Sequence, residues 1–134
     1  MAILLQQHPA TGGPGMEPRW TRGDKDGAGT AYSTLSGVWF TLSRGILTEV
    51  YYPTIDRPQI RDLQYLVTDG ETFFHDERRH LETSYEYVAP QALGIRITNT
   101  APEGRYRILK EVIADDLAGR RAGLVRVRSA PIHP

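Results

Sequence analysis

The residues whose types could do chemistry gather between positions 39 and 62. They are three aromatic side chains, two acids and an arginine: Trp39, Tyr51, Tyr52, Asp56, Arg61 and Asp62. Flat aromatic faces beside carboxylates and a guanidinium suit a sugar, because a pyranose has an apolar face and a rim of hydroxyl groups. The alternative is that Tyr51 and Tyr52 are ordinary strand residues, since tyrosine has a high β-propensity. Composition alone favours this second interpretation.

The sixteen acidic residues do not reveal a catalytic pair. A glycosidase needs one carboxyl group with a raised pKa and a second one at a defined distance across the sugar ring. The sequence shows neither property. Glu49, Asp56, Asp62 and Asp69 occupy positions typical of solvated strand ends. We therefore assign no catalytic residue.

Two polar segments match ligand-binding loops only in part. The segment from His75 to His80 holds two histidines and two acids, but the histidines stand five apart and two arginines between them repel a cation. We expect a solvated turn there and no metal. Residues 24–27 begin like a calcium loop but lack its final acidic ligand. A dinucleotide-binding turn is followed by a helix, and none is expected after residues 27–29. No cofactor is therefore predicted.

The composition of the whole chain narrows the choice of partner. Its 134 residues, 40% of them hydrophobic, suffice for one domain with a core. Sixteen basic residues balance sixteen acidic ones, so no charge excess favours phosphates or anionic lipids. We expect neither nucleic acid nor membrane as a partner, and favour a sugar or a protein surface. The absence of cysteine excludes disulfides and thiolate nucleophiles.

The elements that position these residues are predicted to be short strands. Alternating side chains predict a hairpin of strands 37–43 and 46–52, with a tight turn at Ser43-Arg44-Gly45. Asp69-Gly70 predicts a second hairpin, and residues 75–81 are compatible with one helical turn. Further strands are expected at 63–68, from 72 onward, and at 81–87, 93–98, 105–113 and 124–128. About eight strands at regular spacing predict an all-β antiparallel sandwich.

One predicted strand has an irregular pattern. Tyr106 and Ile108 keep one register, whereas Leu109, Glu111 and Ile113 keep the other. This slip indicates either a β-bulge or a strand that is buried on both faces.

The two ends of the chain carry further expectations. Residues 1–18 lack periodicity and are rich in glycine and proline, so we expect a flexible leader before an ordered domain over 19–134. The apolar run Ala2–Leu5 is too short for a signal peptide, and no segment has the length of a transmembrane helix. The chain is therefore expected to be cytoplasmic.

Five blocks of the sequence, in order, carry a family resemblance. They are Pro18–Thr21, Lys25–Ala31, Val38–Leu47, Glu49–Pro53, and Arg61–Leu63 continuing through Leu66–Gly70. These blocks resemble the N-terminal domain of prokaryotic glucoamylases and glucodextranases, glycoside hydrolase family 15. The resemblance extends more weakly to Val127 through residues 97–100, 104–108 and 124–128.

This resemblance implies a fold, a partner and a role. The fold is an antiparallel supersandwich of the galactose-mutarotase type, and the family's sandwich is longer than this segment, so an incomplete sandwich is expected. In the family a linker joins it to an (α/α)₆ barrel that holds both catalytic carboxyl groups and releases glucose from α-glucans with inversion. No catalytic residue is carried over, and the missing barrel is the implied partner.

The expected function is that of an accessory domain that supports this barrel. The strand end Glu49–Pro53 and the loop to Asp62 are expected to pack near the mouth of the barrel's active site, because aromatic and charged groups are dense there. Two alternatives stay open: a freestanding sandwich that binds α-glucan, and a structural domain without a ligand.

Overall fold

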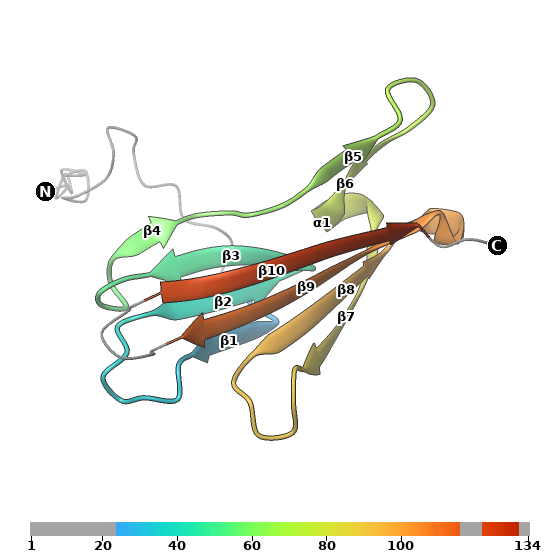
Figure 1. The fold of residues 1–134 in the computed structure, drawn as a ribbon. Helices are drawn as coiled ribbons and strands as arrows, with labels where there is room; N and C mark the ends of the chain where they lie inside the picture. The colour runs from blue at the N-terminus through green and yellow to red at the C-terminus, as the bar shows by residue number, and fades with distance from the viewer. Residues whose placement is uncertain (1–23, 116–121, 132–134) are drawn as a thin grey trace, which may run out of the picture.

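The structure, a computed structural model, describes residues 24–114 and the backbone of residues 115 and 122–131. One four-stranded antiparallel sheet, the first sheet, has the order β1 (Gly27–Thr30), β2 (Trp39–Ser43), β3 (Ile46–Tyr51) and β4 (Pro58–Ile60). The second sheet has the order β10 (Ala122–Pro131), β9 (Tyr106–Asp115), β8 (Ile95–Thr100) and β7 (Glu82–Tyr87). The two sheets face each other (Figure 1).

A smaller hairpin projects from one end of the two sheets (Figure 1). It pairs β5 (Leu66–Thr68) with β6 (Phe74–Asp76), and we call residues 66–76 the arm. The one-turn helix α1 (Glu77–His80) follows directly, and the 3₁₀ turn η1 (Pro102–Gly104) joins β8 to β9. In the part of the chain that the structure describes, neither helical segment has the length needed to cross a membrane.

A single apolar core joins the two sheets. Phe40, Leu42 and Leu47 of the first sheet form one cluster with Ile97 and Val112 of the second. All five are nearly inaccessible to solvent, at most 3% exposed. In β8 and β9 the alternate residues are less buried, as the period of a β-strand requires, whereas residues 46–49 of β3 are all buried. The predicted all-β antiparallel sandwich is therefore confirmed.

The first hairpin has the predicted strands and the predicted turn. Arg44 and Gly45 both have positive φ, at 49° and 76°, which is the two-residue turn whose twist matches that of the paired strands. The register shifts between Phe40 and Leu42, so that Thr41 lies opposite both Thr48 and Glu49. This bulge had no counterpart in the sequence prediction.

One of the two alternatives predicted for β9, a β-bulge at Ile108-Leu109, is wrong. β8 and β9 pair without a shift, from Thr100 opposite Arg107 to Ile95 opposite Val112. The inner face of β9 therefore continues through Ile108, Lys110, Val112 and Ala114, all buried. Lys110 was overlooked as an inner residue because its charge hid the alternation.

Two strands form where the sequence indicated loops. β4 lies in the proline-rich connection after β3 and pairs with it. β1 contains the Gly27-Ala28-Gly29 segment, and Gly29 lies opposite Phe40. A Cβ atom at Gly29 would collide with the Phe40 ring, so this glycine makes room for a core side chain. The predicted leader (1–18) lies outside the described residues, as do 19–23 and 116–121.

The arm is closed by a longer loop than the two residues Asp69-Gly70. The Asp69 carboxylate accepts hydrogen bonds from the backbone N–H groups of Glu71, Thr72 and Phe73, and from the Thr72 hydroxyl. These bonds, the Thr72 hydroxyl foremost, hold the pKa of Asp69 far below its usual value. The helical turn predicted within 75–81 is confirmed as α1, and Asp76 caps it by accepting from the Arg78 N–H.

Candidate functional site

Trp39 and Tyr51 lie side by side on the outer face of the first sheet. They are direct cross-strand partners, and the next pair in register, Phe40 and Val50, faces the core. Side chains in such a pair have Cβ atoms about 5 Å apart. Trp39 remains 39% exposed, and Tyr51 is half-buried. The outer face thus presents two adjacent aromatic side chains that a sugar ring or a protein surface could cover.

A buried carboxylate adjoins this aromatic pair. Glu49 is 4% exposed, and its Oε2 accepts from Lys25 Nζ at 2.6 Å and from the Thr41 hydroxyl. Burial raises the pKa of Glu49, but the hydrogen bonds from Lys25 and Thr41 outweigh it and leave the pKa below its usual value. Burial and the charge of Glu49 in turn raise the pKa of Tyr51. Glu49 is therefore a satisfied anion and a poor proton donor.

Tyr52 does not join the aromatic pair. It follows Tyr51 directly, so it points to the opposite side and packs against the core. Its backbone N–H donates to Arg57 O at 3.0 Å and its carbonyl accepts from the Gln59 side chain at 2.8 Å, which fixes the connection to β4.

The remaining predicted residues lie along the connections around β4. Asp56 is exposed and accepts a hydrogen bond from the Thr54 hydroxyl, which lowers its pKa. Arg61 and Asp62 form an ion pair at 3.6 Å. Asp62 Oδ1 is buried and has no hydrogen-bond partner among the described residues. Buried acceptors are usually hydrogen-bonded, so a donor from outside the described residues would satisfy this one. The structure thus joins Trp39 to Tyr51 and places the other four residues in the connections on either side of β4.

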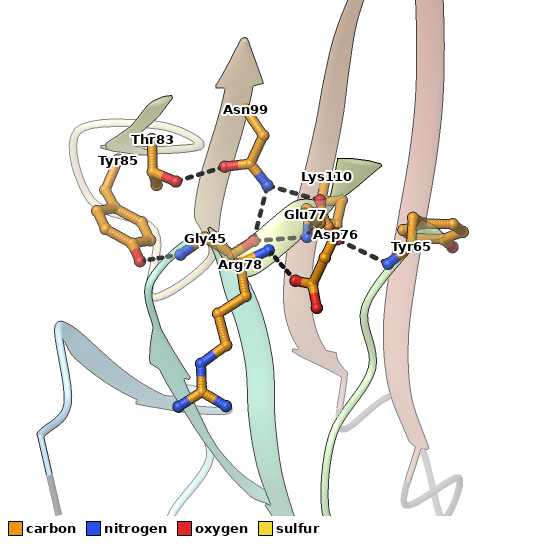
Figure 2. Close-up of polar contacts among 9 residues, drawn as sticks. All are labelled: Gly45, Tyr65, Asp76, Glu77, Arg78, Thr83, Tyr85, Asn99 and Lys110. Atoms are coloured by element: carbon orange, nitrogen blue, oxygen red, sulfur yellow. Dashed lines mark hydrogen bonds and ion pairs between the residues drawn. The ribbon is translucent and has the colours of Figure 1, made fainter. Parts of the chain in front are cut away.

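A second polar site, the clasp, lies buried between the sheets and consists of Gly45, Glu77, Asn99 and Lys110 (Figure 2). Lys110 Nζ donates to Glu77 Oε1 at 2.5 Å and to Gly45 O at 2.6 Å. Asn99 Nδ2 donates to the same two oxygens at 2.6 and 2.9 Å. The three side chains are at most 1% exposed.

The clasp connects three parts of the molecule. Gly45 belongs to the β2–β3 turn of the first sheet, Asn99 and Lys110 to β8 and β9 of the second, and Glu77 to α1. Glu77 Oε2 also accepts from the backbone N–H of Tyr65, at 2.9 Å, next to the start of the arm. A buried charge is costly unless it is paired and hydrogen-bonded. Here each charge meets both conditions.

The outer partners of the clasp complete its hydrogen bonds. Thr83 donates to Asn99 Oδ1 at 2.7 Å, and Lys110 Nζ lies 5.9 Å from the centre of the Tyr65 ring (Figure 2). Burial lowers the pKa of Lys110, against the opposing effect of Glu77. Sequence reasoning missed Glu77, Asn99 and Lys110. The signal that could have found Lys110 is its position in register with Ile108, Val112 and Ala114.

The turn of the first hairpin makes one more contact with the second sheet. Tyr85 accepts from Gly45 N and donates to Asp26 Oδ2, each at 2.7 Å. Asp26 Oδ2 also accepts from the Arg44 N–H at 2.5 Å. Burial, and then the hydrogen bond to Asp26, raise the pKa of Tyr85. The segment that began like a calcium loop therefore uses Asp26 to fasten the two sheets.

The histidines of the 75–80 segment belong to an aromatic cluster. The rings of His75 and His80 stack with centroids 5.7 Å apart, and His75 Nδ1 lies 2.9 Å from the Tyr106 hydroxyl. His80 Nδ1 accepts from the Asp76 N–H at 2.9 Å. Among the side chains of residues 24–114, no three histidine or acidic groups are placed to share a metal ion. Next to this cluster Arg105 lies over the Phe73 ring, 5.4 Å from its centre.

Two antiparallel sheets around one shared core make the molecule an all-β sandwich domain. The clasp is buried between the sheets, and the Trp39–Tyr51 pair lies on the outer face. The family of the domain is shown by a family model described as glucodextranase, domain N, which matches residues 10–129. The chain belongs to this family, and the resemblance found in the sequence is confirmed.

Two relatives extend the comparison to whole enzymes. The chain is 43% identical over 106 residues to a glucoamylase of Clostridium sp. (strain G0005), covering 79% of this chain and 15% of the relative. A crystal structure of a bacterial glucoamylase complexed with acarbose matches with a TM-score of 0.78 and 36% identity, covering 94% of this chain and 18% of that chain. The chain thus spans less than a fifth of each relative.

Proposed function

We propose that this chain is the N-terminal accessory domain of a glucoamylase-type α-glucan exo-hydrolase. It packs on a separate (α/α)₆ catalytic barrel, supports it, and cleaves no glycosidic bond itself. Support comes from the similarity to two glucoamylases, each of which continues far beyond the matched part.

The observation that carries the non-catalytic role is the state of the buried carboxylates. Glycoside hydrolysis requires an acid with a raised pKa that faces a second carboxylate across the sugar. Glu49 and Glu77, both less than 5% exposed, are each neutralised by a lysine at 2.6 and 2.5 Å. The lowered pKa of Glu49 keeps this carboxylate ionised, so it is a poor acid for a leaving group. Both oxygens of Glu77 are occupied by hydrogen bonds from Lys110, Asn99 and the Tyr65 N–H, so neither is open to a substrate.

A glucose-release assay tests this proposal. The purified 134-residue chain should liberate no glucose from maltooligosaccharides or dextran. A chimera of the Clostridium glucoamylase, with its matched segment replaced by this chain, should liberate glucose and unfold at a higher temperature than the catalytic remainder alone. Glucose release by the isolated chain would contradict the proposal. So would a chimera that unfolds at the same temperature as the catalytic remainder alone.

The β3 strand end is proposed to contact the barrel near its active site. Because Tyr51 faces outward and Tyr52 faces the core, the two tyrosines should behave differently. In the chimera Tyr51→Ala should lower kcat/KM about tenfold, the cost of roughly 1.4 kcal/mol of transition-state binding, without loss of stability. Tyr52→Ala should lower the stability as well. Tyr87→Ala, on the exposed side of β7, is the matched control. Unchanged kinetics in stable Tyr51→Ala protein would reject this contact.

Direct glucan binding is the second candidate function, favoured by the exposed Trp39 beside Tyr51. An aromatic platform stacks on the apolar face of a pyranose. Native gel electrophoresis in soluble starch or dextran should then retard the chain, and Trp39→Ala should abolish the retardation. Equal mobility with and without glucan would exclude glucan binding and leave only the supporting role.

A further inference from the structure

A hollow of about 170 Å³ lies where the arm meets the turn η1. Its lining comes from the arm and from η1 with the residue that follows it: Thr72, Phe73, His75, Pro102, Glu103 and Arg105. In Figure 1 the arm and η1 lie at the end of the sheets opposite the β3–β4 connection. The hollow is therefore separate from the Trp39–Tyr51 pair.

Flat ring surfaces form one part of this hollow. The Phe73 and His75 rings lie with centroids 4.7 Å apart and planes tilted by 42°. The His75 ring is fixed through Nδ1, which lies 2.9 Å from the Tyr106 hydroxyl. Its Nε2 has no hydrogen-bond partner among the described residues. The hollow thus combines positioned rings with one imidazole nitrogen that a ligand can use.

A charged pair supplies the polar part of the hollow. Arg105 and Glu103 form an ion pair at 3.6 Å, and their side chains are 50% and 78% exposed. The Arg105 guanidinium lies over the Phe73 ring, which favours one orientation of this cation. The Arg105 side chain makes no hydrogen bond with another described residue, so its N–H donors can serve a ligand.

The backbone at Glu103 adopts a conformation that is rare for an acidic residue. Its φ is 58° and its ψ is 14°, in the left-handed region that favours glycine. Residues held in such conformations cluster at active and ligand-binding sites. Here the strained turn places a carboxylate beside Arg105 in the lining of the hollow.

We propose that this hollow binds a single neutral pyranose. The apolar face of a pyranose suits the Phe73 ring and Pro102, and its hydroxyl groups both donate and accept, as Arg105 and Glu103 require. The opposite charges of these two residues cancel, which favours a neutral ligand over a phosphate. The hollow is smaller than the roughly 300–1,000 Å³ of sites for drug-sized ligands, so it takes one sugar unit. The site does not depend on the accessory role.

Titration of the 134-residue chain with methyl α-D-glucopyranoside, followed by NMR of the backbone amides, tests this site. Amides of residues 72–75 and 103–105 should shift and approach saturation in the millimolar range, as expected for a ligand of this size. No shift at about 100 mM sugar, a hundredfold above a millimolar dissociation constant, would overturn the proposal. So would shifts confined to residues 39–52, or larger shifts at the hollow from inorganic phosphate than from the sugar.

Variants of the charged pair separate ligand binding from a structural role. Glu103→Gly removes the carboxylate and relieves the backbone strain, so the chain should unfold at the same or a higher temperature and bind the sugar at least fivefold more weakly. Arg105→Ala should weaken binding to a similar degree. Unchanged affinity in both variants would overturn the proposal.

Two control variants show whether the effect belongs to the hollow. Arg79→Ala, at a position that is 79% exposed and outside the lining, should bind the sugar as the wild type does. Trp39→Ala should leave the shifts at the hollow unchanged even where it abolishes retardation in starch. Loss of these shifts in Trp39→Ala would assign the sugar to the Trp39–Tyr51 pair and overturn the proposal.

Discussion

Lys110 and Glu77 form an ion pair that is isolated from solvent at 1% and 0% exposure. The attraction between them offsets the cost of removing two charges from water, provided that further hydrogen bonds satisfy both groups. Gly45 O and Asn99 supply those bonds. The stability of the clasp therefore depends on keeping both charges together.

Lys110→Met tests this dependence. It leaves the Glu77 carboxylate buried without a cation, so the free energy of unfolding should fall by about 3–5 kcal/mol. Urea unfolding followed by circular dichroism measures the change. The control is Arg79→Met, in the same helix as Glu77. Arg79 is 79% exposed and its ion pair to Asp76 is 3.9 Å long, so this variant should lower the free energy of unfolding by less than about 1 kcal/mol.

The double variant Glu77→Gln with Lys110→Met separates charge from packing. It removes both charges and keeps an acceptor for the Tyr65 N–H, so it should recover at least half of the lost stability. A double variant as unstable as Lys110→Met would show that packing, not charge, dominates at the clasp.

The pH dependence of stability follows from Glu49. Burial raises its pKa, but hydrogen bonds from Lys25 and Thr41 prevail, so the pKa in the folded state is below that of the unfolded chain. An acid whose pKa is lowered by folding stabilises the folded state at pH values above its pKa in the unfolded chain. This stabilisation is lost as the pH falls through its pKa in the folded chain. The wild-type chain should therefore lose stability below about pH 4.5.

Glu49→Gln should flatten this acid limb. Urea midpoints at pH 7 and pH 3 should differ less in Glu49→Gln than in the wild type, whereas Glu82→Gln, at an exposed position of β7, should behave as the wild type. Equal acid losses in Glu49→Gln and wild type would exclude Glu49 as a source of the pH dependence.

At the scale of elements, the β2–β3 turn determines where the first sheet meets the second. Gly45 has φ of 76°, and a Cβ atom there would collide with Asn99 and Thr83. The carbonyl of this residue accepts from Lys110 and Asn99, and its N–H donates to Tyr85. The turn is therefore both a chain reversal and the contact between sheets.

Gly45→Ala should destabilise the chain by more than backbone strain alone. Strain at positive φ costs about 1–3 kcal/mol, and the collision with Asn99 adds to it. Gly70 has φ of 85° with open space around its Cα, so Gly70→Ala isolates the strain. Thermal unfolding of the two variants should show the larger loss for Gly45→Ala; equal losses would contradict a role for the close contact.

At the scale of the whole molecule, the two sheets share one core and should unfold together. Ile97 of the second sheet is fully buried among Phe40, Leu42 and Leu47 of the first. Ile97→Ala should cost about 2–5 kcal/mol, and Trp39 fluorescence in the first sheet should report the same shifted midpoint as circular dichroism. Two separate midpoints would mean that the sheets do not share a core.

Much of the fold could be predicted because its signals are local. The alternation in β2, β3 and β7 to β9, the Arg44-Gly45 turn and the one-turn helix all follow from residues within a few positions of one another. β1 and β4 could not be predicted, because their few residues gain strand structure only by pairing with β2 and β3.

The candidate site divides in the same way. Trp39 and Tyr51 share a face because the hairpin register places them opposite each other, and the sequence indicated that hairpin. Tyr52 was grouped with Tyr51, although consecutive strand residues point to opposite faces. The clasp was invisible, since its ion pair joins residues 33 positions apart and its carbonyl bond to Lys110 spans 65.

The sequence by itself determined the strand alternation, the turn chemistry and the family, because each is written in neighbouring residues or in ordered blocks. Only the tertiary structure decided that a lysine and a glutamate lie inside the sandwich and that the arm presents Leu66 and Phe74 outward. A charge can occupy a core only where a partner from a distant segment meets it, and that meeting is a property of the folded chain.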